Sequence, residues 1–375
     1  MIIKRPASKI RQGGLLLYAT SLRVADLKVN DFYKIETLDA GEGVGYQRVL
    51  NEGRAKRLAD YLVDAHQARE AFLPTSIFLA TDKLLAFDDT TSILTIDTSA
   101  VGPFNVVDGQ HRIRGLVLAA ARNGDLDNFE VPVNIAVGLD EISQMCHFLI
   151  VNTTQKSVDR AIEQQIVARL TDMIDFENTP VLPKWIQRQV EKGEDQRALA
   201  IAHYLNTESG SPWRGRIVMA NSSNDAGTGT INQKSFVSSL KKYILVPSNP
   251  ISLQETEKLQ RILKNYWTVV SELLVDDDEA VSVLFRTNGV DLFHIVSPTV
   301  FLHLANQRDF RQDTIRSVLQ RGFDNLPAEF IAMSSPQFWH RGQEASGMNQ
   351  AAIRKYAHAL AGAINTPQTA SDIAI

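Results

Sequence analysis

The sequence predicts a mixed α/β (α+β) fold, with an α/β core in the N-terminal half and a mostly helical C-terminal domain. Two observations carry this prediction: short apolar runs alternate with helical patterns in the first half, and helical periodicity dominates from residue 157 onward. The chain has 375 residues, the length of two domains of roughly 100–200 residues each. We therefore predict one domain over 1–156 and a second over 157–375.

The first elements are a strand and a helix. Residues 15–19 form an apolar run after a pair of glycines, which predicts a strand that follows a turn. Asn51 is a favourable N-cap residue, and the apolar residues after it recur at helical spacing: Ala55, Leu58, Leu62 and Ala65. A helix is therefore predicted to begin after Asn51.

Three short strands come next, over the apolar stretches 76–80, 83–87 and 92–96. The acidic pair Asp88-Asp89 lies between the second and third stretches, and it predicts a hairpin there.

A strand over 104–107 is predicted to run directly into a second helix. The apolar face of that helix is made by Ile113, Leu116, Val117 and Ala120. Asn123-Gly124 is typical of a helix end, and residues 131–137 predict a further strand. Strand-to-helix junctions of this kind are what place the first half in the α/β class.

Helical periodicity describes most of the second half. The predicted helical stretches are 157–174, 184–205, 233–244, 253–275 and 311–324. The polar run 221–230 predicts a loop, and the last ten residues, 366–375, have no packing pattern and predict a free tail.

Composition and charge exclude several classes of protein. The formal net charge of −4 argues against a protein that coats nucleic acid by bulk charge, so any DNA contact has to come from local patches. The single cysteine, Cys146, allows no internal disulfide and is expected to be a small buried hydrophobe. We see neither a signal peptide nor a run long enough to span a membrane, and we expect a cytoplasmic protein.

The segment 108–112, Asp-Gly-Gln-His-Arg, is the main candidate for chemistry. A helix N-terminus exposes unpaired backbone N–H groups and the positive end of the helix dipole, and it normally attracts acidic side chains. Here the first turn carries His111, Arg112 and Arg114, and cations at such a position cost about 0.3–1 kcal/mol each. An anion bound at the junction would offset that cost.

Each residue of the junction has a predicted part in holding the anion. Gly109 lets the backbone approach closely, Arg112 can bind phosphate oxygens with both arms of its guanidinium, and His111 can donate a hydrogen bond or shuttle a proton. Asp108 either caps the helix or holds the arginine fork. The alternative is that Asp108 caps the helix and the basic side chains simply point into water.

A second basic helix start supports the same interpretation. Gln47 and Arg48 precede the helix that begins after Asn51, and its first turns carry Arg54, Lys56 and Arg57. Two helix N-termini with excess positive charge are able to flank one anion. The alternative for the three helical cations is an ordinary solvated face.

A third polar block follows the apolar run 148–151. We expect it to be a loop before a helix that begins near Val158. Amide, hydroxyl and ammonium groups together suit a base edge, a ribose or a phosphate, and the residues that offer them are Asn152, Thr153, Gln155 and Lys156. The alternative is helix capping and loop hydration.

These blocks resemble the DGQHR-domain family of prokaryotic DNA-modification proteins. The matching stretches are Tyr46-Gln47-Arg48, residues 106–112 and residues 150–158, and the similarity extends over about 44–170. That family includes DndB-like proteins, associated with DNA phosphorothioation, and DpdB-like proteins, associated with 7-deazaguanine insertion. Its core resembles the ParB/sulfiredoxin fold, which the resemblance therefore implies for the N-terminal domain.

The resemblance also implies roles for the residues. Gly109, His111 and Arg112 would contact nucleotide phosphates, Asp108 would support a metal or catalysis, and Gln110 would order the turn. Sulfiredoxins have a cysteine where this chain has Gln110, so reduction of a sulfinic acid is not expected. The predicted catalytic set is Asp108, His111 and Arg112, and the predicted phosphate-binding set is Gln47, Arg48, Gly109, Gln110, Asn152, Thr153, Gln155 and Lys156.

The leading functional hypothesis is a nucleotide-binding ATPase component of a DNA-modification system, similar to the DpdB-like proteins of 7-deazaguanine insertion. It implies ATP or another NTP with Mg²⁺ as cofactors, and DNA and other modification proteins as partners, with self-association left open. No protein residues are predicted to form a resident metal site. The chain has no Walker A pattern, since the glycine-containing stretch 226–230 lacks the lysine.

Two alternatives belong to other classes. One is a DndB-like DNA-binding regulator of transcription of a phosphorothioation operon, which would bind a promoter without turnover. The other is a ParB-like nuclease, which needs clustered carboxylates for a metal; Asp108 with Asp88 or Asp89 would have to supply them.

Overall fold

The computed structural model describes residues 1–39, 44–155, 160–174, 182–222, 228–276 and 282–366. The chain divides into two compact units, Met1–Arg188 and Gln189–Ile375. This division lies beyond the boundary after residue 156 that the change of pattern predicts. Helix α6 (Arg160–Met173) belongs to the first unit because its Arg169 guanidinium donates to the Gly45 carbonyl and, at 3.0 Å, to Glu141.

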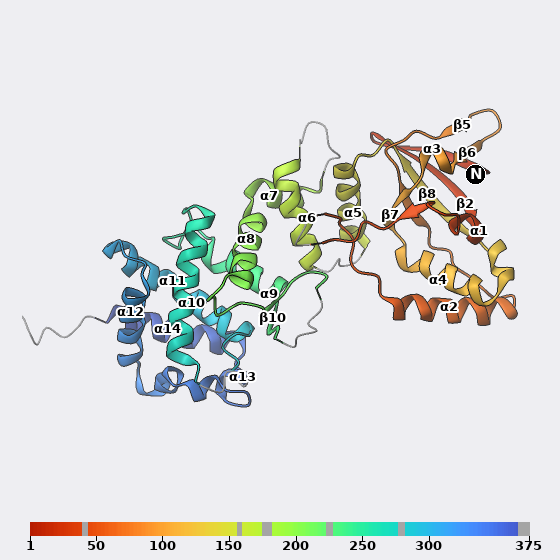
Figure 1. Cartoon of the computed structure of the whole chain (residues 1–375). Coiled ribbons are helices and arrows are strands. Elements are labelled where there is room, and N and C mark those ends of the chain that lie inside the picture. The colour runs from red at the N-terminus through yellow and green to blue at the C-terminus, as the bar shows by residue number, and fades with distance from the viewer. Residues whose placement is uncertain (40–43, 156–159, 175–181, 223–227, 277–281, 367–375) are drawn as a thin grey trace, which may run out of the picture. The chain divides into compact units, whose positions relative to one another are not determined.

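The first unit is built on one mixed sheet (Figure 1). Its strands are β1 (Ile2–Gln12), β2 (Leu15–Arg23), β3 (Tyr33–Lys34), β4 (Ile77–Ala80), β5 (Ala86–Asp88), β6 (Ile93–Asp97), β7 (Phe104–Asp108) and β8 (Glu130–Val137). They lie in the order β3-β7-β4-β8-β2-β1-β6-β5. The pairs β3–β7 and β4–β8 are parallel and the others are antiparallel.

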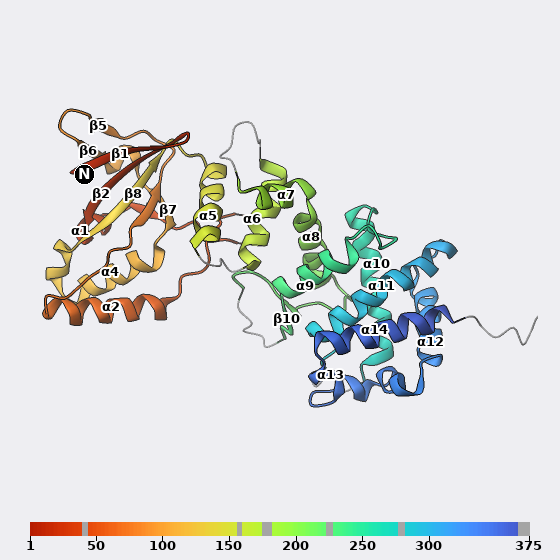
Figure 2. The ribbon, with the colours of Figure 1, turned by 180° about the vertical axis from the view of Figure 1, so that it is seen from behind.

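Two helices cover one face of this sheet and enclose its core. Helices α2 (Glu52–Gln67) and α4 (Gln110–Arg122) lie side by side beneath the strands (Figures 1 and 2). Their apolar stripes, such as Leu62 and Ile113, are buried against strand residues that include Leu79 and Val106. The helices are able to approach closely because Gly115 of α4 has no side chain; an added Cβ would lie 2.9 Å from the side chain of Leu58.

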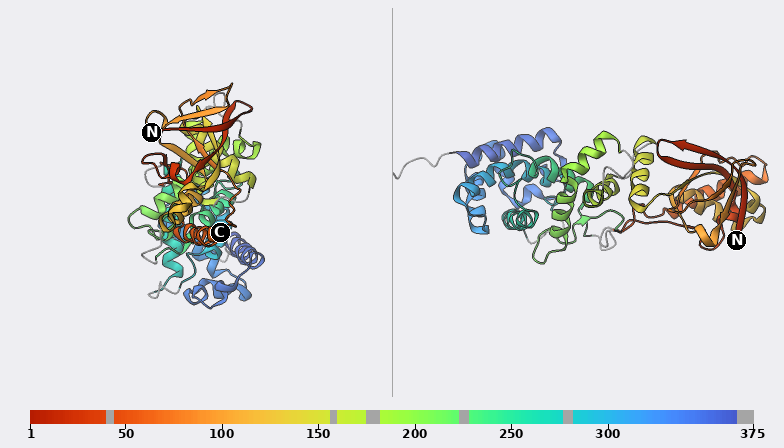
Figure 3. Two further views of the ribbon diagram at one scale, coloured as in Figure 1. Left: turned by 90° about the vertical axis from the view of Figure 1, so that its right-hand side faces the viewer. Right: turned by 90° about the horizontal axis from the view of Figure 1, so that it is seen from above.

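The remaining helices of the first unit are short or lie apart from this pair. They are α1 (Val24–Leu27), α3 (Thr98–Val101), the 3-10 turn η1 (Gly124–Asn128), α5 (Glu141–Gln155) and α6. Helix α5 packs beside β7, and the arrangement can be followed from two further directions in Figure 3.

The mixed α/β class is confirmed, and so are most of the predicted elements of the first half. Asn51 caps α2 by accepting from the Arg54 backbone N–H at 2.9 Å. The hairpin after Asp88 is present, since β5 and β6 pair antiparallel, although β5 begins only at Ala86. Asn123 is the C-cap of α4, while Gly124 starts η1. Cys146 is buried, and burial raises the pKa of its thiol to about 12.

In the first half one strand was missed and one local prediction was wrong. The long strand β1 was not predicted, because most of its residues are exposed or half-buried and show no apolar alternation. The block after residue 151 was expected to be a loop, but α5 continues through it to Gln155. The predicted helix start near Val158 lies outside the described residues.

The second unit is mostly helical, as the sequence predicts. Its elements, with α7 at the boundary, are α7 (Lys184–Lys192), α8 (Glu194–Thr207), β9 (Ile217–Val218), β10 (Ile231–Asn232), α9 (Gln233–Ser239), the π-helical turn η2 (Leu240–Ile244), α10 (Thr256–Leu274), α11 (Thr287–Gln307), α12 (Gln312–Asp324), the 3-10 turns η4 (Ala328–Ser334) and η5 (Pro336–Trp339), α13 (Glu344–Gly347) and α14 (Gln350–Asn365).

Three differences from prediction occur in this unit. The single helical stretch predicted over 184–205 is divided by Gly193, which has φ +61°. Helices α11 and α14 were not predicted, and α11 is buried on several sides, so it has no polar face to mark a helical period. In the loop predicted at 221–230, the described residues 221–222 and 228–230 are in neither helix nor strand, while 223–227 lie outside the described residues, as does nearly all of the tail predicted at 366–375. None of the described helices is both long and apolar enough to cross a membrane.

Candidate functional site

The predicted strand-to-helix junction is present in the first unit. Strand β7 ends at Asp108, Gly109 follows, and α4 begins at Gln110. Gly109 has φ +107°, a conformation that L side chains rarely adopt, and an added Cβ would lie 3.3 Å from the side chain of Ile77. No side chain caps this helix, so the N–H groups of its first turn are not used by a capping residue.

Asp108 holds the arginine fork instead of capping the helix. Its carboxylate accepts from the Arg112 guanidinium, which also donates to the carbonyl of Ser76. The alternative in which Asp108 caps α4 and Arg112 points into water is therefore wrong. Arg112 is fixed in place, with about a fifth of its side chain exposed.

His111 joins the N-termini of the two helices. Its Nε2 accepts a hydrogen bond from the backbone N–H of Asn51 at 3.0 Å, which leaves the ring proton on Nδ1. Burial, followed by the nearby charges of Arg54 and Arg48, lowers the pKa of His111. The imidazole is therefore neutral near pH 7, and the positive charge of the site comes from arginines.

A second contact joins the same two segments. The Gln110 side-chain amide donates to the carbonyl of Arg48 at 3.1 Å, so Gln110 orders the chain before α2 as well as its own turn. The two basic helix starts that the sequence suggested are thereby adjacent in space.

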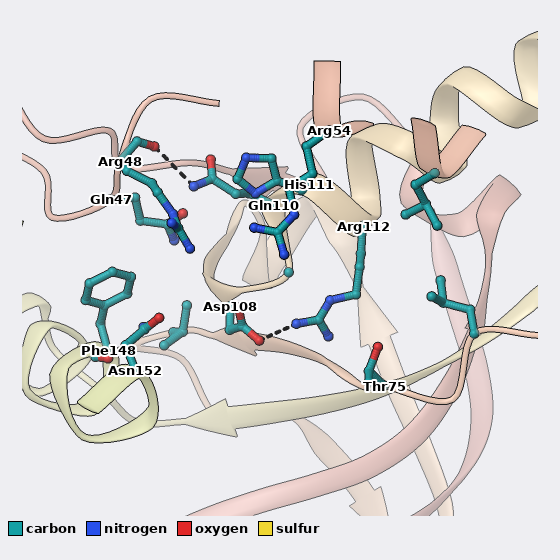
Figure 4. A pocket seen from close by; sticks show the side chains of 14 residues that line it. Gln47, Arg48, Arg54, Thr75, Asp108, Gln110, His111, Arg112, Phe148 and Asn152 are labelled. Atoms are coloured by element: carbon teal, nitrogen blue, oxygen red, sulfur yellow. Dashed lines mark hydrogen bonds and ion pairs between the residues drawn. The ribbon is translucent and has the colours of Figure 1, made fainter. Parts of the chain in front are cut away.

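A pocket of about 310 Å³ lies where these segments meet. Figure 4 shows the side chains of Arg48 and Arg54 extending toward the same space above the Asp108–Arg112 pair. In the part of the chain that the structure describes, no carboxylate pairs with the guanidinium of either arginine. The pocket is lined by Gln47, Arg48, Arg54, Leu58, Leu73, Thr75, Val107, Asp108, Gly109, Gln110, His111, Arg112, Phe148 and Asn152.

Most of the predicted site residues line this one pocket. Asn152 comes from α5, where its amide donates to the Phe148 carbonyl at 2.8 Å. Thr153 and Gln155 are in the same helix, but their side chains, and all of Lys156, lie outside the described residues. Arg54 was missing from the predicted binding set, because only the tertiary contact between His111 and Asn51 shows that the first turn of α2 faces the junction.

The carboxylates that a nuclease would need are not together. Asp88 ends β5, at the far edge of the sheet, with five strands between it and Asp108 on β7. Asp89 is engaged with Lys9 at 3.0 Å. Among the described residues no group of three or more His, Cys, Asp or Glu side chains is placed to hold a metal. The pairing of Asp108 with Asp88 or Asp89 is therefore wrong.

Fold and site together define an α/β protein in which two helix N-termini and three arginines surround one pocket beside a mixed sheet. The chain belongs to the DndB family, described as DNA-sulfur modification-associated, whose family model matches residues 5–318. Comparisons with curated proteins and with solved structures found no match. Of the two DNA modifications that the sequence resemblance implied, the family match concerns the sulfur modification.

Proposed function

We propose that the chain is a component of a DNA-sulfur modification system that binds ATP or another NTP through its phosphates. The observation that carries the proposal is the pocket's charge. It gathers Arg48, Arg54 and Arg112 against one carboxylate, Asp108, at an uncapped helix start. Unbalanced positive charge of this kind at a helix N-terminus suits an anion with several oxygens.

The pocket's geometry supports phosphate over a single carboxylate ligand. Arg48 and Arg54 approach from the α2 side, and the N–H groups of α4 lie beside the bare backbone of Gly109. A phosphate offers three acceptor oxygens, so one group can engage a guanidinium and the helix start together. Neutral His111 adds a hydrogen-bond donor at Nδ1 without further charge.

Hydrolysis of the bound nucleotide is the second part of the proposal. Mg²⁺ is commonly held by one or two carboxylates together with substrate phosphates, and Asp108, the carboxylate in the pocket lining, fits that role. A bound Mg²⁺ would neutralise charge on the phosphates. Arg112, already oriented by Asp108, would stabilise the charge that develops during transfer.

Replacing Arg112 with alanine tests hydrolysis. We expect phosphate release from ATP, saturating in nucleotide, to fall by about 100-fold, because a guanidinium aimed at developing charge is lost. Arg112→Lys keeps the charge but not the fork, and we expect it to recover only part of the rate. Equal rates for the wild type and Arg112→Ala would rule out this role. No release by the wild type, with nucleotide still bound, would reduce the proposal to binding alone.

A regulator of transcription is the second candidate. Its support is the setting: the family match concerns DNA-sulfur modification, and the sequence resemblance places a regulator in operons of that modification. A gel shift with the upstream region of the chain's own operon is expected to show a sequence-specific complex, weakened as salt rises. Binding that does not distinguish this region from unrelated DNA would contradict the regulator.

A further inference from the structure

A second cavity adjoins the arginine-lined pocket and has a different character. Its volume is about 680 Å³, and it lies among strands β1, β2, β4 and β8 and helix α5. Its walls include Thr75, Asp108 and Arg112, which also line the first pocket. The Asp108–Arg112 ion pair is therefore a wall common to both spaces, and Figure 4 shows it with Thr75 along one side of the first pocket.

The rest of the second cavity is largely apolar. Leu15 and Leu17 of β2, Phe78 of β4 and Ile150 of α5 form its walls. The exposed arginines that dominate the first pocket, Arg48 and Arg54, do not reach it. An apolar cavity of this size, within the roughly 300–1,000 Å³ typical of small-molecule sites, suits a flat ring system better than a further phosphate.

A few polar groups interrupt these apolar walls. The Asn134 side-chain amide donates to the Ser76 hydroxyl at 3.0 Å, and this hydrogen bond fixes the orientation of the amide. Its side-chain oxygen is a hydrogen-bond acceptor. His147 of α5 lines the same cavity, and burial lowers the pKa of His147, so its neutral ring offers one donor and one acceptor. Paired donors and acceptors in an apolar cavity are what a nucleobase edge requires.

We propose that the second cavity binds the base and sugar of the nucleotide whose phosphates occupy the first pocket, with the Asp108–Arg112 pair at the joint between them. This inference rests on the proposed nucleotide binding and adds where the nucleoside lies. The ligand is a nucleotide, either free in solution or as part of a single DNA strand.

Filling the cavity tests the proposal. Leu15→Trp places a large ring in the cavity and leaves the arginine-lined pocket intact, because Leu15 does not line that pocket. We expect wild-type protein to bind at least one of ATP, GTP, CTP and UTP at least tenfold more tightly than inorganic tripolyphosphate. In Leu15→Trp that advantage should disappear while tripolyphosphate binding stays unchanged. Calorimetry measures both affinities.

Two further variants guard against misfolding. Ile2→Trp makes the same kind of change at an exposed position of the neighbouring strand β1, outside both spaces, and should bind like the wild type. Asn134→Leu removes the amide but keeps a side chain that branches at Cγ, and it should also reduce the advantage of the NTP. Thermal unfolding of each variant shows whether the fold is retained.

The outcomes separate this proposal from the one on which it rests. If the wild type binds tripolyphosphate as tightly as every NTP, the second cavity takes no base, and phosphate binding stands alone. If folded Leu15→Trp and Asn134→Leu keep the full advantage of the NTP, the base lies elsewhere and the inference is overturned. If the wild type binds neither ligand, the proposed function fails first, and this inference fails with it.

A further experiment, on the binding of single-stranded DNA, distinguishes a free nucleotide from a nucleotide within a DNA strand. A single-stranded oligonucleotide is compared with the same strand carrying abasic sites, in wild type and in Leu15→Trp. A preference for intact bases that Leu15→Trp abolishes assigns the cavity to a nucleotide within a strand. A preference confined to mononucleotides assigns it to a free NTP.

Discussion

Replacing both Arg48 and Arg54 with alanine is expected to weaken NTP binding by about 100-fold or more. Hydrogen bonds to charged groups contribute about 1.5–3 kcal/mol each, and removing two such groups corresponds to at least that factor. Both side chains are exposed and line the pocket, so the fold should tolerate their loss. The affinity is measured by calorimetry, and the wild-type affinity should fall as salt rises.

The matched control for this double variant is Lys56→Ala with Arg57→Ala. Lys56 and Arg57 are exposed on the same helix and do not line the pocket. Replacing them with alanine removes the same total charge as replacing Arg48 and Arg54. We expect a loss of less than about fivefold from them, which is the size of a screened long-range effect. If both double variants weaken binding equally, the ligand responds to the general charge of α2, and the pocket is not its site.

The second large effect is a loss of stability of the second unit at acid pH. His294 is fully buried on α11, where its Nδ1 lies 2.9 Å from the Ser239 hydroxyl, and burial lowers the pKa of His294 to about 3. A histidine that is neutral in the fold but protonates near pH 6.5 when unfolded stabilises the fold above that pH. Its contribution is lost progressively as pH falls from about 6.5 toward 3.

The expected loss is about 2 kcal/mol between pH 7 and pH 5. Urea unfolding followed by tryptophan fluorescence reports on this unit, because Trp213, Trp267 and Trp339 are buried in it. His294→Phe keeps an aromatic ring for the edge-on contacts with Phe236 and Trp267. Its free energy of unfolding should change much less between pH 7 and pH 5 than that of the wild type, even if the variant is less stable than the wild type at pH 7.

Exposed His358 supplies the comparison for this experiment. His358→Asn should retain the full loss of stability between pH 7 and pH 5. An unchanged pH dependence in folded His294→Phe would show that other groups cause the acid sensitivity of the second unit.

The parts of the fold and site that were predicted depend on local chemistry. The Asn51 cap and the strand that runs into Asp108 and the second helix each follow from a few neighbouring residues. The helices that were missed lack such a signal. Helix α11 is surrounded by protein, and α5 ends in polar residues that resemble a loop.

The site could be predicted only segment by segment. The sequence identified both basic helix starts, but their adjacency depends on long-range contacts from His111 to Asn51 and from Gln110 to Arg48. The second cavity had no signature at all, because Leu15, Phe78 and Asn134 come from three different strands. Each looks like an ordinary sheet residue until the strand order is known.

The loop that carries Arg48 is held at both ends, and this has a consequence for the entropy of ligand binding. Arg169 binds the carbonyl of Gly45 at one end, and Gln110 binds the carbonyl of Arg48 at the other. A loop left loose in the free protein would have to lose backbone freedom on binding, at about 1–2 kcal/mol for each residue that becomes ordered. In this protein the loop around Arg48 is already ordered by folding, so ligand binding has to immobilise only side chains there.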